Sequence, residues 1–172
     1  MILVILVACS FFLSLSEIAI AGSRKIKLKL LAESGDERAN KVIELQENSA
    51  DFFASTQVGV NAVAILGGIV GESSLRPYFY NLATELYPGP WAETIGFSLS
   101  FLTVTSLFIL FADLMPKRLA MIFPEKLAIK VINPITIFIK ICRPLAWAIN
   151  IIANSIFRVF KIDTKRDDSM TF

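Results

Sequence analysis

Two acidic residues, Glu17 and Asp113, interrupt or close stretches of the sequence that are otherwise uncharged. An ionisable group inside a membrane-spanning segment is costly and is therefore a candidate functional group. The alternative is that each carboxylate forms an ion pair at the membrane boundary, where Arg24, Lys25 and Lys117 are the available partners. Because both acids lie toward the same side of the predicted membrane helices, they are expected to share one cavity.

Polar and small side chains recur at helical spacing around these acids, so each apolar stretch has one polar face. The faces comprise Ser10, Ser14 and Glu17 in the first stretch, Gln57, Asn61, Ala64, Gly68 and Gly71 in the second, and Thr103, Ser106 and Asp113 in the third. Such faces often serve only to pack membrane helices together. Beside two carboxylates, they also predict a polar site between the helices.

Pro116 adds a backbone oxygen to this set. It cannot donate a hydrogen bond to the carbonyl of Ala112, so that carbonyl needs another partner. Carbonyls of broken membrane helices coordinate cations in transporters. The sequence has no histidine, and its cysteines, Cys9 and Cys142, lie within or beside apolar stretches. The expected ligands are therefore all oxygens, which suit magnesium, calcium or sodium.

The composition places these residues in a membrane protein. The chain has 172 residues, of which 55% are hydrophobic, and its mean hydropathy is +0.63. A net charge of only +2 excludes a generic basic nucleic-acid binder, so no nucleic-acid partner is expected. Long uncharged stretches predict membrane spans at residues 1–22, 52–71 and 94–115. The first is interpreted as a span rather than a signal peptide because it lacks a basic beginning.

The segment after the third span is apolar but carries charges and three prolines. Pro124, Pro134 and Pro144 divide it into short pieces, and Lys and Arg lie beside Trp147. This pattern predicts amphipathic belt helices along the membrane surface over residues 125–160. A fourth span over residues 134–157 is the alternative. The polar residues 161–172 are expected to be a linker to a further region.

Loop charges predict the orientation in the membrane. Residues 24–51 hold six Lys or Arg and the region after the third span holds ten, whereas residues 72–93 hold only Arg76. By the positive-inside rule, the first loop and the C-terminus are cytoplasmic and the N-terminus and the 72–93 loop are outside. Within the first loop, Ser34-Gly35-Asp36 is expected to separate two helices of a hairpin. The predicted location is the cell (inner) membrane.

Four segments of the chain carry a family resemblance. They read FFLSLSEIA at 11–19, LAESGD at 31–36, STQVG at 55–59 and FADLMPKRLA at 111–120. Together they resemble the transmembrane domain of the CorC and cyclin M transporter family. The resemblance implies an all-α, dimeric membrane domain of three spans with a juxtamembrane belt. It also implies that cytosolic CBS domains follow, and that Mg²⁺ is exported in exchange for Na⁺ as coupling ion.

The resemblance also extends the candidate site. Its matching positions add Ser16, Ser55 and Gly59 to the residues that the polar faces and Pro116 indicate. The full candidate set for cation binding is Ser10, Ser14, Ser16, Glu17, Ser55, Gly59, Asn61, Ala112, Asp113 and Pro116.

Two departures from the family pattern bear on the substrate. Ala112-Asp113 stands where the family usually reads Gly-Glu, and Val60 precedes Asn61 where a polar residue often follows the glycine. These changes resemble a branch associated with the export of diamines such as putrescine and cadaverine. The leading prediction is a Mg²⁺ exporter and not an enzyme. The alternatives are a diamine exporter and a non-transporting membrane anchor for a regulatory cytosolic module.

Overall fold

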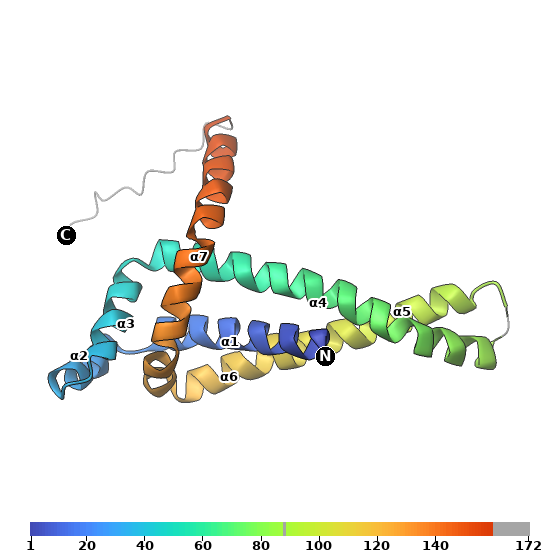
Figure 1. Ribbon diagram of the computed structural model, residues 1–172, viewed down its shortest axis with the longest axis horizontal. Coiled ribbons are helices and arrows are strands. Elements are labelled where there is room, and N and C mark those ends of the chain that lie inside the picture. Colours follow the sequence, from blue (N-terminus) through green and yellow to red (C-terminus); the bar gives the residue numbers. More distant parts are fainter. Residues whose placement is uncertain (88, 160–172) are drawn as a thin grey trace, which may run out of the picture.

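The computed structural model describes residues 1–87 and 89–159, all in helices and their connections. The predicted linker 161–172 lies outside the described residues. In chain order the elements are α1 (Ile2–Gly22), α2 (Lys25–Glu33), α3 (Glu37–Glu47), α4 (Ser49–Leu86), α5 (Ala92–Leu107), the π-helix η1 (Phe108–Leu114), α6 (Met115–Ile122) and α7 (Pro124–Val159) (Figure 1). The predicted all-α class is confirmed for the described residues.

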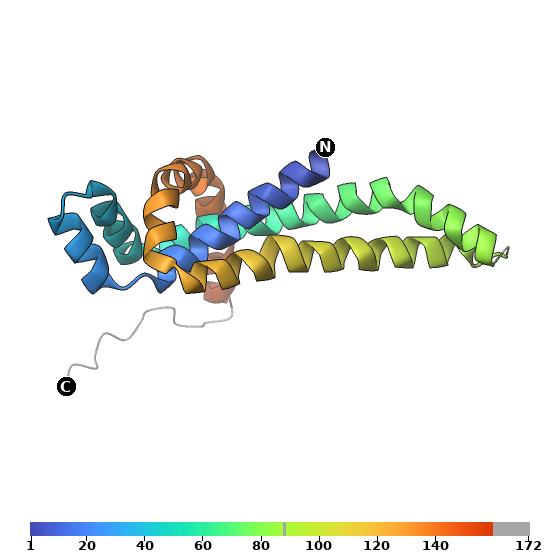
Figure 2. The ribbon, with the colours of Figure 1, turned by 90° about the horizontal axis from the view of Figure 1, so that it is seen from below.

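Within the described residues, four helical segments are long and apolar enough to cross a membrane. They are Ile2–Gly22, Ser49–Leu86, Ala92–Ile122 and Pro124–Ile149. The first three contain the predicted spans, and the fourth contains most of the predicted belt. In Figures 1 and 2, α1, α4 and the continuous α5–η1–α6 segment run roughly along one direction, whereas α7 crosses them. The chain is thus a multi-pass membrane protein whose fourth long helix has a different direction from the others.

The prediction of a loop at residues 72–93 is wrong for most of that segment, because the segment is largely helical. Helix α4 has 38 residues and continues to Leu86, and α5 starts at Ala92, so the two form a long helical hairpin (Figure 1). Three charged groups in this region form ion pairs, because the Arg76 guanidinium lies 3.8 Å from Glu72 Oε1 and 3.0 Å from Glu93 Oε1. Gly96 allows the backbones to approach closely, since a Cβ there would lie 2.8 Å from the Tyr80 Cα. Ion pairing and close packing therefore extend the helices past the apolar run.

The predicted division of the belt at Pro134 and Pro144 was also wrong. Both prolines lie inside the single helix α7. Each proline removes one backbone donor, but the helix gains burial because Ile132, Ile135 and Ile139 pack into the main core. Packing of this apolar face supports the helix around Pro134, and α7 continues past Pro144 as well.

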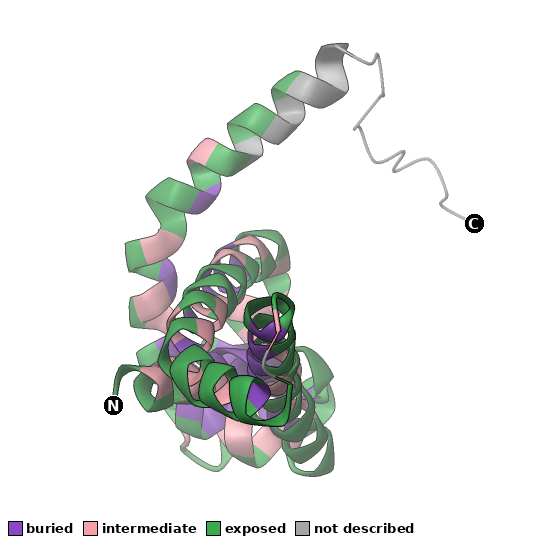
Figure 3. Cartoon of the chain, turned by 90° about the vertical axis from the view of Figure 1, so that its right-hand side faces the viewer, coloured by how far each residue is buried: buried purple, intermediate pink, exposed green. Residues whose placement is uncertain are grey.

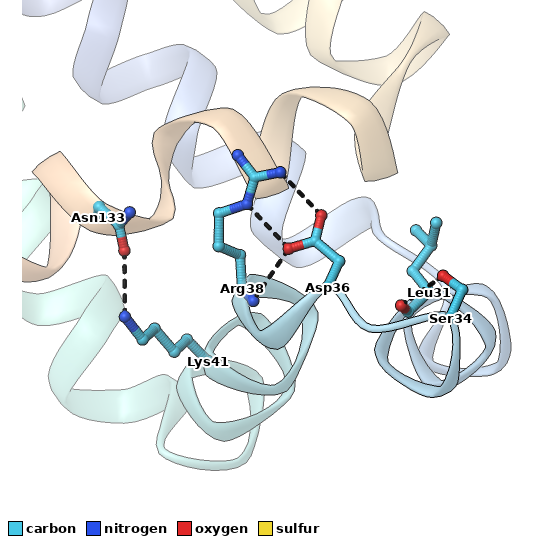
Figure 4. Close-up of polar contacts among 6 residues, drawn as sticks. All are labelled: Leu31, Ser34, Asp36, Arg38, Lys41 and Asn133. Carbon is cyan, nitrogen blue, oxygen red and sulfur yellow. Dashed lines mark hydrogen bonds and ion pairs between the residues drawn. The ribbon is translucent and has the colours of Figure 1, made fainter.

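The hairpin of α2 and α3 was predicted correctly at its turn. Gly35 has a φ of 100°, a left-handed conformation that glycine adopts without strain. Asp36 then caps α3 by accepting a 3.1 Å hydrogen bond from the Arg38 backbone N–H (Figure 4). Bonds of 2.9 Å from the Arg38 guanidinium hold the pKa of the Asp36 carboxyl below its usual range. Lys41 attaches the hairpin to α7 through a 3.3 Å bond from Nζ to the Asn133 Oδ1.

In the described part of the chain, two apolar clusters hold the helices together. The larger joins α1, the hairpin, α4, α6 and α7, and includes the buried Ile20, Leu28 and Phe52. The smaller consists of Val104, Phe108 and Ala112, packed against Leu3, Leu6, Val7 and Leu75. Figure 3 shows the buried residues gathered where the helices meet. Large apolar side chains such as Ile65, Ile69 and Leu102 are exposed, as expected for surfaces in contact with lipid.

Glycines on α4 allow the smaller cluster to form. A Cβ at Gly67 would overlap the ring of Phe108, and a Cβ at Gly71 would lie 2.5 Å from Val104 Cγ1. The open position is Gly68, where a Cβ would meet no atom within 4 Å. Gly67 and Gly71 therefore allow α4 to pack closely against α5 and η1.

Candidate functional site

A cavity of about 370 Å³ lies between α1, α4 and the η1–α6 segment. Its lining combines polar and charged groups with an apolar wall. The lining residues are Ser10, Ser14, Glu17, Ile18, Gln57, Val60, Asn61, Ala64, Phe108, Ile109, Ala112, Asp113 and Lys117. Helix packing thus joins residues from the three predicted polar faces in one place.

Six predicted site residues line this cavity. They are Ser10, Ser14, Glu17, Asn61, Ala112 and Asp113. The common cavity expected for Glu17 and Asp113 is present, because α1 packs directly against η1 and α6. Ser10, Ser14, Glu17, Asn61 and Asp113 come from the polar faces that helical spacing predicted, whereas Ala112 was indicated by Pro116.

The other four predicted residues lie elsewhere. Ser16 Oγ donates a 2.7 Å hydrogen bond to the Phe12 carbonyl of its own helix. Ser55 lines a different pocket beside Asp51 and Arg143. Gly59 faces the ring of Phe138 on α7, and Pro116 is fully buried in α6.

The turn before Pro116 departs from α-helical bonding, as the proline predicted. Residues Phe108–Leu114 form the π-helix η1, and the N–H of Met115 donates to the carbonyl of Leu110, five residues earlier. Wider turns of this kind are frequent at functional sites. The π-helix lies along the cavity and presents Phe108, Ile109, Ala112 and Asp113 to it.

The charges in the cavity include one close ion pair. Lys117 Nζ lies 2.6 Å from Asp113 Oδ1, one helical turn away. Both side chains are partly exposed, at 38% and 43% respectively. Glu17 lines the same cavity. The boundary ion pair considered for Asp113 is thus present, and it lies in the cavity wall rather than apart from it.

Neutral polar groups complete the cavity. Ser14 is 1% exposed, and its Oγ has no hydrogen-bond partner in residues 1–87 or the described part of 89–159. Gln57 Nε2 donates a 3.4 Å hydrogen bond to Asn61 Oδ1 one turn along α4. A buried hydroxyl without a partner is costly and marks a position where a donor or a cation can bind.

Sequence reasoning missed part of the wall. Phe108 and Ile109 line the cavity although they are apolar, and so the polar pattern did not select them. Their spacing does carry a signal, because they lie one turn before Ala112 and Asp113. Conversely, Thr103 of the third polar face bonds to the Leu99 carbonyl of its own helix at 2.7 Å.

Carboxylates and softer ligands do not gather elsewhere in the described residues. Among residues 1–87 and 89–159 with described side chains, no three His, Cys, Asp or Glu lie close enough to hold a metal ion together. The cavity instead combines two carboxylates with one lysine ammonium.

Comparison with known proteins identifies relatives along the whole chain. Residues 1–171 match the family described as the cyclin M transmembrane N-terminal domain. The chain is 48% identical over 171 residues to a polyamine export protein of Escherichia coli K12, covering 99% of this chain and 38% of that protein. It is 51% identical over 166 residues to a polyamine export protein of Salmonella typhimurium, covering 96% and 37%.

A more distant relative carries a family name only. A UPF0053 protein of Synechocystis is 27% identical over 168 residues, which cover 97% of this chain and 38% of that protein. The chain therefore spans less than two fifths of the length of these relatives.

Proposed function

We propose, from the premise that the chain belongs to the family of cyclin M transmembrane N-terminal domains, that it forms the membrane part of a polyamine exporter. The cavity between α1, α4 and the η1–α6 segment is its cation-binding site. The names of the relatives support this substrate class, because proteins 48% and 51% identical to the chain are called polyamine export proteins. They favour the diamine alternative over the Mg²⁺ export that led the sequence analysis.

The observation that carries the proposal is the mixed chemistry of the cavity. A protonated diamine has an ammonium at each end, which donates hydrogen bonds to carboxylates, amide oxygens and hydroxyls. Glu17, Asp113 and the unpartnered Ser14 Oγ supply such acceptors. The methylenes between the ammoniums need apolar contacts, which Ile18, Val60 and Phe108 provide. An aromatic ring such as that of Phe108 also attracts cations.

The topology proposed is three spans with α7 along the membrane surface. Helices α1, α4 and α5–η1–α6 run in a common direction, and α7 crosses them (Figures 1 and 2). The first half of α7 also carries Lys126, Lys130 and Lys140, which suit a cytoplasmic surface. In this orientation Glu17 and Asp113 lie toward the cytoplasm, where the amine enters. A homodimer, cytosolic CBS domains and a Na⁺ coupling ion stay predictions from the family resemblance.

The transport proposal is tested with the full-length protein that contains this chain, reconstituted in liposomes. We expect movement of radiolabelled putrescine across the membrane and no comparable movement of Mg²⁺. Mg²⁺ flux without putrescine flux would instead support the leading interpretation of the sequence. Absence of both, in vesicles that hold correctly folded protein, would favour a non-transporting anchor.

The orientation gives a separate prediction. In a variant without Cys9 and Cys142, a cysteine in place of the exposed Glu85 at the end of α4 should react from outside intact cells with an impermeant thiol reagent. A cysteine in place of the exposed Glu37 at the start of α3 should react only after the cells are opened. Labelling of position 37 in sealed cells would invert the proposed topology.

A further inference from the structure

We propose that Lys117 competes with the transported amine for Asp113. In the substrate-free protein, the Lys117 ammonium occupies the position beside Asp113 that an ammonium of the substrate would take. The substrate must displace it to bind. The inference rests on the proposed function, because it concerns the same cavity and the same substrate class. It goes further by assigning to Lys117 control of how tightly the amine is held.

The chemistry of the two groups is nearly identical. A lysine side chain is a primary ammonium at the end of four methylenes, and putrescine is four methylenes with a primary ammonium at each end. Lys117 Nζ lies 2.6 Å from Asp113 Oδ1, and both residues line the cavity. Whatever contacts Asp113 offers to one end of a diamine, it already offers to Lys117.

Other acceptors in the cavity are left without a partner. Ser14 Oγ is buried and accepts or donates no hydrogen bond in the described part of the chain. Glu17 forms no ion pair with a described side chain, although it lines the same cavity as Lys117. The Lys117 ammonium therefore pairs with Asp113 and leaves Glu17 and the Ser14 hydroxyl available to a ligand.

The charge balance favours displacement over simultaneous binding. The two carboxyl groups of the cavity can balance at most two positive charges, whereas the Lys117 ammonium and a diamine together bring three. The charges cancel only when the Lys117 ammonium leaves. A third cation held in the same cavity would face like-charge repulsion in a region of low dielectric.

The position of Lys117 allows it to leave. Its side chain is 38% exposed and lies in the first turn of α6, so a rotation of its flexible stem carries the ammonium toward the boundary. When the amine departs, the same ammonium returns to Asp113 and keeps the carboxylate from being left unpaired. Lys117 thereby weakens substrate binding and favours substrate release.

The test is putrescine binding to the full-length protein, measured by calorimetry for the wild type and for Lys117→Met. We expect the variant to bind putrescine roughly fivefold more tightly, because a partly exposed ion pair no longer competes. Arg76→Met is the matched control. Arg76 also pairs with an acid one turn away, Glu72 at 3.8 Å, but does not line the cavity. The affinity of the Arg76→Met variant for putrescine should equal that of the wild type.

A second measurement uses the wild type alone and does not depend on the variant's folding. Lys117 acylation by an amine-reactive reagent is followed by mass spectrometry, relative to the exposed Lys130 on α7. Saturating putrescine should raise the relative acylation of Lys117, since the displaced ammonium is no longer paired.

The outcomes separate the two proposals. Wild-type binding of putrescine with no tightening in Lys117→Met and no change in acylation would overturn the role of Lys117 and leave the proposed function standing. A wild type that neither binds nor transports putrescine would overturn both.

Discussion

Asp113→Asn is expected to lower the affinity of the full-length protein for putrescine by roughly ten- to a hundredfold, and to reduce export accordingly. Hydrogen bonds to a charged group contribute about 1.5–3 kcal/mol, and about 1.4 kcal/mol corresponds to a factor of ten. Asparagine keeps the shape of the side chain but removes the charge. It also leaves Lys117 without its 2.6 Å partner in the cavity wall, which further disfavours a second cation.

Asp51→Asn is the control for this change. Asp51 is also an aspartate, in the first turn of α4, and it also pairs with a basic residue, Arg143, at 3.4 Å. It lies in the pocket between α4 and α7 and not in the cavity of Asp113. Its replacement should leave putrescine binding and flux near the wild-type values. Equal effects of the two substitutions would mean that the cavity of Glu17 and Asp113 is not the binding site.

The cavity was predictable because helical periodicity is a strong signal in apolar segments. Glu17 and Asp113 are far apart in the sequence, yet each marks the polar face of an otherwise apolar helix. Polar faces of membrane helices avoid lipid by turning toward one another. Packing of α1 against η1 and α6 therefore brought the two acids into one cavity.

The residues that failed to join the cavity differ from the others in their position around the helix. Ser16 lies two residues after Ser14, which is about 200° around an α-helix. Gly59 stands in the same relation to Asn61 on α4. Both were selected by the family resemblance, which identifies positions but not the faces on which they lie. Ser16 therefore bonds within α1, and Gly59 serves the contact with Phe138.

Helix lengths were less predictable because charge and proline act locally, whereas helix ends are decided by packing. Glu72 and Arg76 were expected to end a span, but they pair with each other and with Glu93 across the hairpin. Pro134 was expected to divide the belt, but the burial of Ile132 and Ile135 on either side of it supports α7 there. These tertiary contacts cannot be read from the sequence, and they outweigh the local effects of charge and proline on helix ends.

Gly67→Ala is expected to lower the stability of the full-length protein by about 1–3 kcal/mol, the typical cost of inserting a methyl group into a packed interior. A Cβ at Gly67 would overlap the ring of Phe108, which is only 9% exposed and packs against Val104 and Ala112. The ring has little room within this cluster, so it must shift toward the cavity that it lines. The variant should therefore bind putrescine more weakly as well as unfold at a lower temperature.

Gly68→Ala is the neighbouring control on the same helix. A Cβ there meets no atom within 4 Å, and alanine favours a helix over glycine by up to about 1 kcal/mol. This variant should unfold at the wild-type temperature or slightly above it, with unchanged affinity for putrescine. Thermal unfolding in mild detergent, followed with and without putrescine, measures both effects. Equal stability of the two variants would show that the Phe108 ring does not need the space left by Gly67. The close approach of α4 and η1 would then not determine the form of the cavity.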